Sequence, residues 1–227
     1  MTTALTLVIA NKNYSSWSSR PWLAMTELGI AFQERMLKFE SNDWAQNIAT
    51  LSPSRLVPVL WEGDLGRGFA SFDTLAILER LHELYPDKGI WPRDAKARAR
   101  ARSLAADFHA GYRALRGAMP MNLRGRYPGK GMSPEVARDI EGLTGHWTRT
   151  RRDFGASGPF LFGPYCAADA YFTPVASRFV TYGVALEGEA RSYQQTLLGT
   201  ASFAAWRKAA LEESEFVAAD EPYAQPR

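Results

Sequence analysis

The chain has 227 residues, 46% of them hydrophobic and 12% aromatic, which is enough to bury a substantial core in one large domain or two small ones. Its 27 lysines and arginines outnumber its 24 aspartates and glutamates by only three, whereas a nucleic-acid-binding protein usually carries a stronger, clustered basic excess. The single cysteine, Cys166, excludes an intrachain disulfide and a zinc site made of several thiolates. No apolar run reaches the roughly 18 residues that a membrane span requires. We therefore expect a cytoplasmic protein with no metal, no nucleic-acid partner and no membrane partner.

The first part of the chain predicts alternating strands and helices. Residues 5–10 predict a short buried strand, because an apolar run ends at the polar Asn11. Residues 17–28 carry apolar side chains at roughly helical spacing, and Gly29 follows where a helix would end. The later elements are a strand at 32–39, a helix at 42–50, strands at 57–61 and 66–71, and a helix at 72–85. Their order is β-α-β-α-β-β-α, with a parallel pair of strands in the opening βαβ unit.

Pro58 is unusual for its place in a predicted strand. Proline has no backbone N–H and cannot donate to the strand ladder. The position therefore predicts either an ordinary edge-strand proline or a cis bond that presents the preceding residue to a ligand.

The second part of the chain predicts helices only. Residues 86–94 break every periodicity and predict a linker. The helices beyond it are predicted at 95–117, 134–154, 167–182, 189–198 and 202–213. The expected organisation is an α/β domain at 1–85, a linker at 86–94 and an all-α domain at 95–227.

Four short segments in this order carry a family resemblance. They are Tyr-Ser-Ser-Trp-Ser-Ser-Arg at 14–20, Val-Pro at 57–58, Asp-Thr-Leu-Ala-Ile at 73–77, and Phe-Leu-Phe-Gly at 160–163 leading to Ala168-Asp169. Each segment is weak alone, but their order and spacing resemble those of the cytosolic glutathione transferases over nearly the whole chain. The serine-rich segment looks most like the zeta and tau classes and related bacterial proteins.

The resemblance implies a fold and a function. The fold is a thioredoxin-like N-terminal domain that binds glutathione, followed by an all-helical domain that binds the second substrate. The implied reaction is attack of the glutathione thiolate on a small, hydrophobic electrophile, with glutathione as co-substrate and a homodimer as the assembly. The alternatives are a glutathione-dependent isomerase of the maleylacetoacetate isomerase type and a non-catalytic binding module of the same fold.

Ser15 and Ser16 are the candidate catalytic residues. A free thiol with a pKa near ~8.5 is mostly protonated at neutral pH, and a hydroxyl at a helix N-terminus can stabilise the thiolate by donating to sulfur. Aligned on Arg20, Ser15 takes the position of the activating serine in zeta and tau enzymes. Ser16 is the main alternative and Tyr14 a distant third, while plain helix capping is the structural alternative for both serines.

The resemblance also assigns the glutathione-binding residues. The backbone of Val57, before Pro58, would pair with the cysteinyl unit like an added strand. Asp73 would bind the γ-glutamyl ammonium and Thr74 its carboxylate, although Asp73 is one methylene shorter than the glutamate usual in the family. Arg55 would bind the glycyl carboxylate. The alternatives are a plain Asp cap at Asp73 and a solvated side chain at Arg55.

The electrophile site is expected to combine the first segment with the predicted helix at 95–117. Tyr112 and Arg116 are four residues apart and share a helix face. Its expected residues are Tyr14, Trp17, Phe108, Tyr112, Arg116 and Met119. Core packing is an equal alternative for Phe108 and Met119. Arg178 is a weaker candidate for an anionic electrophile, with an exposed, solvated side chain as the favoured alternative.

Overall fold

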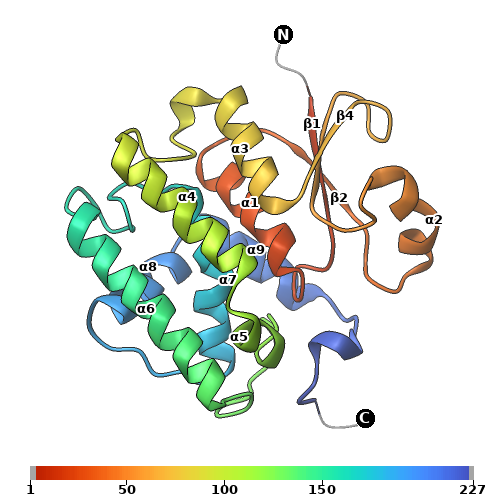
Figure 1. Cartoon of the computed structure of the whole chain (residues 1–227). Helices are drawn as coiled ribbons and strands as arrows, with labels where there is room; N and C mark the ends of the chain where they lie inside the picture. Colours follow the sequence, from red (N-terminus) through yellow and green to blue (C-terminus); the bar gives the residue numbers. More distant parts are fainter. Residues whose placement is uncertain (1–3, 225–227) are drawn as a thin grey trace.

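The computed structural model describes residues 4–224, and its first part is built on a four-stranded sheet (Figure 1). The strands are β1 (Leu5–Ile9), β2 (Gln33–Met36), β3 (Val59–Glu62) and β4 (Phe69–Phe72). Their order in the sheet is β2-β1-β3-β4. Strand β1 pairs parallel with β2 and antiparallel with β3, and β3 pairs antiparallel with β4. The parallel β1–β2 pair confirms the βαβ unit expected from the sequence.

Helices cover both faces of the sheet. They are α1 (Ser16–Glu27), α2 (Asn42–Leu51) and α3 (Thr74–Leu84). Successive side chains of a strand point to opposite faces, so Leu7 and Ile9 pack in the core that includes α1 and α3. Val8 packs on the other face, with Ile48 and Leu51 of α2. This alternation explains why β1 reads as a continuous apolar run.

The rest of the chain is helical, and α7 lies at its centre (Figure 1). The helices are α4 (Ala95–Ala110), α5 (Arg113–Ala118), α6 (Pro134–Phe154), α7 (Ala167–Thr181), α8 (Gly188–Leu198) and α9 (Ala201–Glu212), with short 3-10 turns η1 (Pro86–Lys88) and η2 (Ala218–Asp220). Nearly every residue of α7 is buried, because the helix packs against α1, α4 and α8 at once. The order of elements confirms the predicted fold class.

The single helix predicted at 95–117 is wrong. The structure has α4 and α5 with a break at Gly111 and Tyr112, and Tyr112 adopts a left-handed backbone with φ of 53°. The side chain of Arg116 donates to the carbonyls of His109 and Gly111, which leaves these end-of-helix acceptors satisfied. Apolar periodicity continues through the break, and the sequence pattern therefore does not reveal it.

Three strand predictions were misplaced at their ends. The second strand spans Gln33–Met36 rather than 32–39. The third strand begins at Val59 rather than Val57, because residues 57 and 58 belong to the preceding turn, whose Val57–Pro58 bond is cis. The fourth strand begins at Phe69, since residues 64–68 form the turn itself, closed by bonds from Arg67 and Gly68 to the carbonyl of Asp64. None of the helices in residues 4–224 combines the length and the apolar character needed to cross a membrane.

Candidate active site

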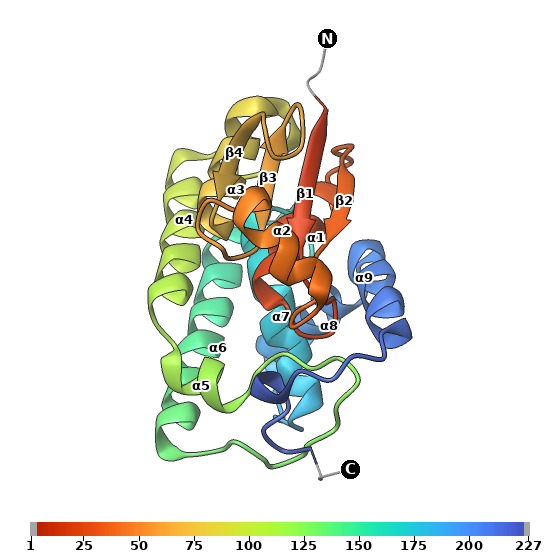
Figure 2. The ribbon, with the colours of Figure 1, turned by 90° about the vertical axis from the view of Figure 1, so that its right-hand side faces the viewer.

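A cavity of about 490 Å³ opens at the N-terminus of α1. Its wall is made by residues 14–17, the turn before β3, helix α5 with the loop after it, one side chain of α7, and Asp220 near the C-terminus. Figure 2 shows the last segment of the chain, in dark blue, below α1 and α2. Residues distant in sequence therefore meet at the start of one helix.

The two candidate catalytic serines both line this cavity and make different contacts. Ser15 is the N-cap of α1: its Oγ accepts from the Ser18 amide at 3.4 Å and donates to Ser18 Oγ at 2.7 Å. Ser16 Oγ accepts a hydrogen bond from Nη2 of Arg178 at 2.9 Å. Ser15 therefore caps α1 and also lines the cavity. Ser16 lines the cavity and is linked to α7 through Arg178.

Of the expected glutathione-binding residues, only Val57 lines the cavity; its wall does not include Arg55, Pro58, Asp73 or Thr74. Thr74 is buried, and its hydroxyl donates to the carbonyl of Trp17 at 3.0 Å. Asp73 caps α3, with Oδ1 accepting from the amides of residues 75 and 76, and its Oδ2 lies 3.4 Å from Nε2 of His109. Arg55 is exposed in the turn that precedes β3.

The six residues expected at the electrophile site separate into two groups. Tyr14, Trp17 and Arg116 line the cavity, and the Arg116 guanidinium lies 4.9 Å from the centre of the Trp17 ring. Phe108 and Met119 are instead buried in the core, which is the alternative that the sequence analysis gave for both. The cavity wall does not include Tyr112, whose hydroxyl donates to Asp107 at 3.0 Å.

Arginine side chains surround the start of α1, and this feature was largely missed from the sequence. Arg178 is only 5% exposed, so the expectation of a solvated side chain was wrong. Arg20 is fully buried; Nη1 donates to the Ser16 carbonyl at 2.6 Å and Nε to the Tyr171 carbonyl at 3.0 Å. Burial lowers the pKa of Arg20 to about 9 and that of Arg178 to about 10, so both remain charged at neutral pH.

These charges have no carboxylate partner in the described part of the chain. No Asp or Glu oxygen of residues 4–224 lies within 4.0 Å of the side-chain nitrogens of Arg20, Arg116 or Arg178. An unpaired buried charge is costly unless something else stabilises it. The N-terminal end of α1 adds the positive end of a helix dipole to the same place. The cavity therefore favours a negatively charged occupant.

The segment after α9 fastens the neighbourhood of Tyr14. The Tyr14 hydroxyl donates to Glu221 at 2.6 Å and accepts from Arg124 at 2.7 Å. Burial, together with the hydrogen bond to Glu221, raises the pKa of Tyr14. Lys38 forms an ion pair with Glu215 of the same segment. Tyr14 is therefore held in place by contacts with this segment and with Arg124.

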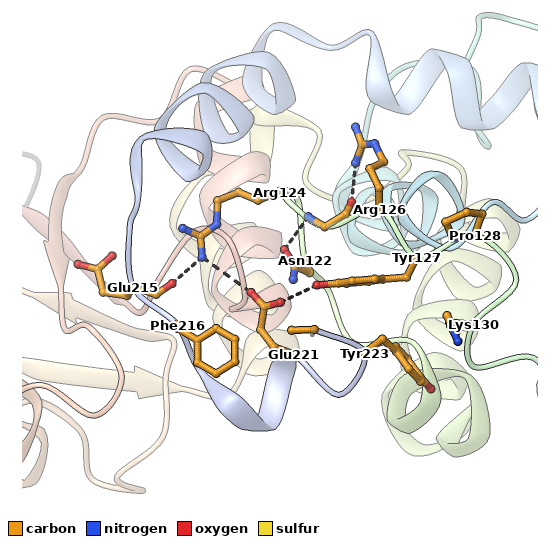
Figure 3. Close-up of a pocket in the computed structure, with 12 residues that line it drawn as sticks. Asn122, Arg124, Arg126, Tyr127, Pro128, Lys130, Glu215, Phe216, Glu221 and Tyr223 are labelled. Atoms are coloured by element: carbon orange, nitrogen blue, oxygen red, sulfur yellow. Dashed lines mark hydrogen bonds and ion pairs between the residues drawn. The ribbon is translucent and has the colours of Figure 1, made fainter. Parts of the chain in front are cut away.

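A larger cavity, of about 820 Å³, is lined in part by the same segment (Figure 3). Glu221 accepts there from Tyr127 at 2.7 Å and lies 3.9 Å from Arg124, whereas Arg126 and Lys130 form no ion pair with the described residues. This cavity contains none of the serines of the first segment. The larger volume alone would favour this second cavity as the active site, whereas the candidate catalytic hydroxyls line the smaller one.

Two other features bear on possible chemistry. Cys166 is fully buried, and burial raises the pKa of its thiol, which disfavours the nucleophilic thiolate. Among residues 4–224, no three His, Cys, Asp or Glu side chains are grouped so as to hold a metal ion.

Comparison with a family model identifies the first part of the chain. Residues 14–84 match the model of the glutathione S-transferase N-terminal domain. That stretch begins at Tyr14 and ends at the last residue of α3. The sequence matches none of the curated proteins with which it was compared.

Solved structures share the whole fold at low sequence identity. A glutathione transferase homolog from Burkholderia gl BGR1, with bound glutathione, has a TM-score of 0.69 and 22% identity over 92% of this chain and 100% of its own. Glutathione transferase Omega 2S from Trametes versicolor, with bound 2,4-dihydroxybenzophenone, has a TM-score of 0.70 and 19% identity over 93% and 98%. Maleylacetoacetate isomerase from Anaeromyxobacter dehalogenans 2CP-1, with glutathione in its active site, has a TM-score of 0.63 and 23% identity over 90% and 95%.

Proposed function

We propose that the chain, whose residues 14–84 match the glutathione S-transferase N-terminal domain, is a glutathione transferase that activates the thiol of glutathione for attack on a small electrophile. The observation that carries the proposal is the cavity at the N-terminus of α1, where Ser15, Ser16 and Val57 share one wall. The sulfur forms a bond to the electrophilic carbon, and a leaving group such as chloride departs with its bonding pair. Addition to a double bond would instead leave the pair on the neighbouring carbon, which then takes a proton from water.

The start of α1 supplies what thiol ionisation needs. Lowering a thiol pKa by two units requires only about 2.7 kcal/mol of preferential stabilisation of the thiolate. A hydrogen bond from Ser15, the positive end of the α1 dipole and the nearby buried arginines all favour the anion. In the absence of glutathione the Ser15 hydroxyl donates to Ser18, and a sulfur near the α1 N-terminus would offer it a charged acceptor instead.

We assign the rest of glutathione to the groups beside this helix end. Val57 lies outside the helices and strands, and its backbone makes no hydrogen bond with the other described residues. We therefore propose that it pairs with the cysteinyl unit. Oδ1 of Asp73 caps α3, and we assign the γ-glutamyl ammonium to Oδ2, which lies 3.4 Å from Nε2 of His109. Because the Thr74 hydroxyl is engaged with Trp17, we assign the γ-glutamyl carboxylate chiefly to the amides at the start of α3. Arg55 is the proposed partner of the glycyl carboxylate.

Isomerisation is the second candidate activity. A glutathione-dependent isomerase uses the same activated thiolate and regenerates it at the end of the cycle. A structure of a maleylacetoacetate isomerase shares the fold, and the basic cavity wall suits an acidic substrate as well as a thiolate. A non-catalytic binding module remains the third alternative; it would need neither the unpaired arginines nor a cavity at Ser15.

Glutathione affinity combined with electrophile turnover tests the proposed function. We expect calorimetric binding of glutathione and turnover of at least one member of a panel of aryl halides, activated alkenes and maleyl-type alkenes. Ser103→Ala should behave like the wild type in both assays, because Ser103 lies exposed on α4 and its hydroxyl donates only within its own helix. A protein that neither binds glutathione nor turns over any of the panel would overturn the proposal.

We also propose a homodimer in the cytoplasm. Strand β4 is an edge strand with exposed Phe69 and Phe72, and Leu56 is exposed nearby in the chain. Apolar side chains on the helical part, including Val180 and Leu211, are exposed as well. A twofold dimer that pairs the N-terminal part of one subunit with the helical part of the other would bury both sets. Light scattering at micromolar concentration should give about twice the 25.3 kDa monomer mass, and a monomer mass would contradict this assembly.

A further inference from the structure

Arg178 is a buried cation with unused hydrogen-bond donors on the wall of the active-site cavity. It reaches from α7 to the start of α1, where Nη2 donates to Ser16. The residue is only 5% exposed, and its Nε and Nη1 atoms have no hydrogen-bond partner in the described part of the chain. Buried guanidinium groups normally satisfy their donors, so these two N–H groups mark a place for an acceptor.

Two further arginines line the same cavity. Arg116 uses Nη1 on backbone carbonyls, and its guanidinium lies over the face of Trp17. Arg113 precedes it by one turn of α5. The carboxylate that lines the cavity, Asp220, forms no ion pair within 4.0 Å of these guanidinium groups. The wall thus carries three guanidinium groups and one carboxylate, whose charge acts on Arg178 without an ion pair between them.

We propose that Arg178, with Arg116, forms a subsite that binds a carboxylate carried by the electrophile itself. This inference rests on the proposed function and names the substrate class of that site. A planar guanidinium binds a carboxylate through two parallel hydrogen bonds; in Arg178 the unpartnered Nη1 can form such a pair with the N–H of Nη2 that Ser16 does not use. Glutathione's own carboxylates are assigned to the start of α3 and to Arg55, none of which lines this cavity.

The link between Arg178 and Ser16 sets the distance between the two anions. Ser16 is the residue next to Ser15, so an acid group on Arg178 would lie close to the sulfur-binding hydroxyl. The electrophilic carbon should therefore be only a few bonds from the carboxylate. Asp220, on the same wall, would oppose a second negative charge, and its removal should favour the bound acid.

A matched pair of electrophiles tests the subsite. Both 4-chloro-3,5-dinitrobenzoate and 4-chloro-3,5-dinitrobenzamide lose chloride to a thiolate, and only the first carries a charge. We expect kcat/KM of the wild type to favour the benzoate, and Arg178→Met to lower it about 10- to 100-fold for the benzoate and less than about 3-fold for the amide. Arg178→Lys should restore part of the benzoate rate. Arg126→Met is the control, since Arg126 lines the larger cavity instead.

A second measurement uses the unmodified protein, in case Arg178→Met fails to fold. The glutathione conjugates of the two compounds are titrated as ligands of the wild type and of Asp220→Asn. We expect the carboxylate conjugate to bind at least about 10-fold more tightly than the amide conjugate, and Asp220→Asn to tighten it further. Equal affinities, or equal losses for both electrophiles in Arg178→Met, would overturn the subsite while leaving glutathione activation intact. Absence of glutathione binding and of both conjugates would overturn the proposed function as well.

Discussion

The N-termini of α1 and α7 are both capped by side chains, but the two caps serve different purposes. At the start of α7, the carboxylate of Asp169 accepts from the amide of Cys166 at 2.9 Å, the amide of Leu161 at 3.2 Å and the hydroxyl of Tyr193 at 2.8 Å. All of these groups are buried, and the helix end is closed within the fold. At the start of α1, neutral hydroxyls take the capping position and the surrounding charges are left without acids.

The contrast shows how one fold separates stability from function. A buried acid at a helix N-terminus fills the anion position permanently. The serine at the N-cap of α1 satisfies the amides only in part and leaves the positive end of the helix open to a ligand. The protein thus keeps one such position for an incoming anion and closes the other with its own side chain.

Breaking the closed helix end should have the largest effect on stability. In Asp169→Ala three buried donors lose their acceptor, and each costs about 1–3 kcal/mol. We expect the free energy of unfolding to fall by about 3 kcal/mol or more and Tm by roughly 10 °C. Differential scanning calorimetry measures the change. A Tm within a degree or two of wild type would show that α7 does not depend on this carboxylate.

Replacing Asp73, the N-cap of α3, should have an intermediate effect, and that effect should be on glutathione binding. Removing one ammonium partner loses an interaction that is equal in ground and transition states, so Asp73→Ala should raise KM for glutathione about 10-fold with kcat little changed. Asp73→Asn is the matched control, because asparagine keeps the cap of α3 and tolerates the left-handed φ of 75° but has no charge. Both variants should show the raised KM. An unchanged KM with a collapsed kcat would assign Asp73 a different role.

Asp220 should give the smallest effect, and one that depends on pH. Burial raises the pKa of Asp220 to about 6, with Arg178 opposing and Glu221 reinforcing the shift. Between about pH 4 and pH 6 the folded state binds more protons than the unfolded state, so the contribution of Asp220 to stability falls as pH rises through this window. Asp220→Asn should be more stable than wild type by about 1 kcal/mol at pH 7 and equal to it at pH 4. Urea titrations at both pH values measure the difference, and a variant less stable at pH 7 would contradict it.

Much of the fold follows from local patterns. Helix α6 has the predicted bounds of 134–154, because a Ser-Pro start and a Gly end enclose a clear periodicity. The break between α4 and α5 was not predictable in this way, since it depends on a left-handed Tyr112 and on the long side chain of Arg116.

The candidate site was predictable where a turn motif carries it. Ser15, Ser16, Trp17 and Val57 line the cavity because they lie in two such turns. The place of Arg178 depends instead on which face of α7 meets α1. A lone arginine within a helix of apolar residues was the available signal, because such a helix is buried all round.

The ionisation of bound glutathione tests the central claim most directly. The absorbance of the thiolate is titrated against pH in the wild type, Ser15→Ala, Ser15→Thr and Ser16→Ala. Loss of one charge-assisted hydrogen bond is worth roughly 1.5 to 3 kcal/mol, so the thiol pKa should rise by about one to two units in Ser15→Ala and stay near wild type in Ser15→Thr and Ser16→Ala. A pKa that rises in Ser16→Ala and stays unmoved in Ser15→Ala would contradict the assignment and make Ser15 only the cap of α1.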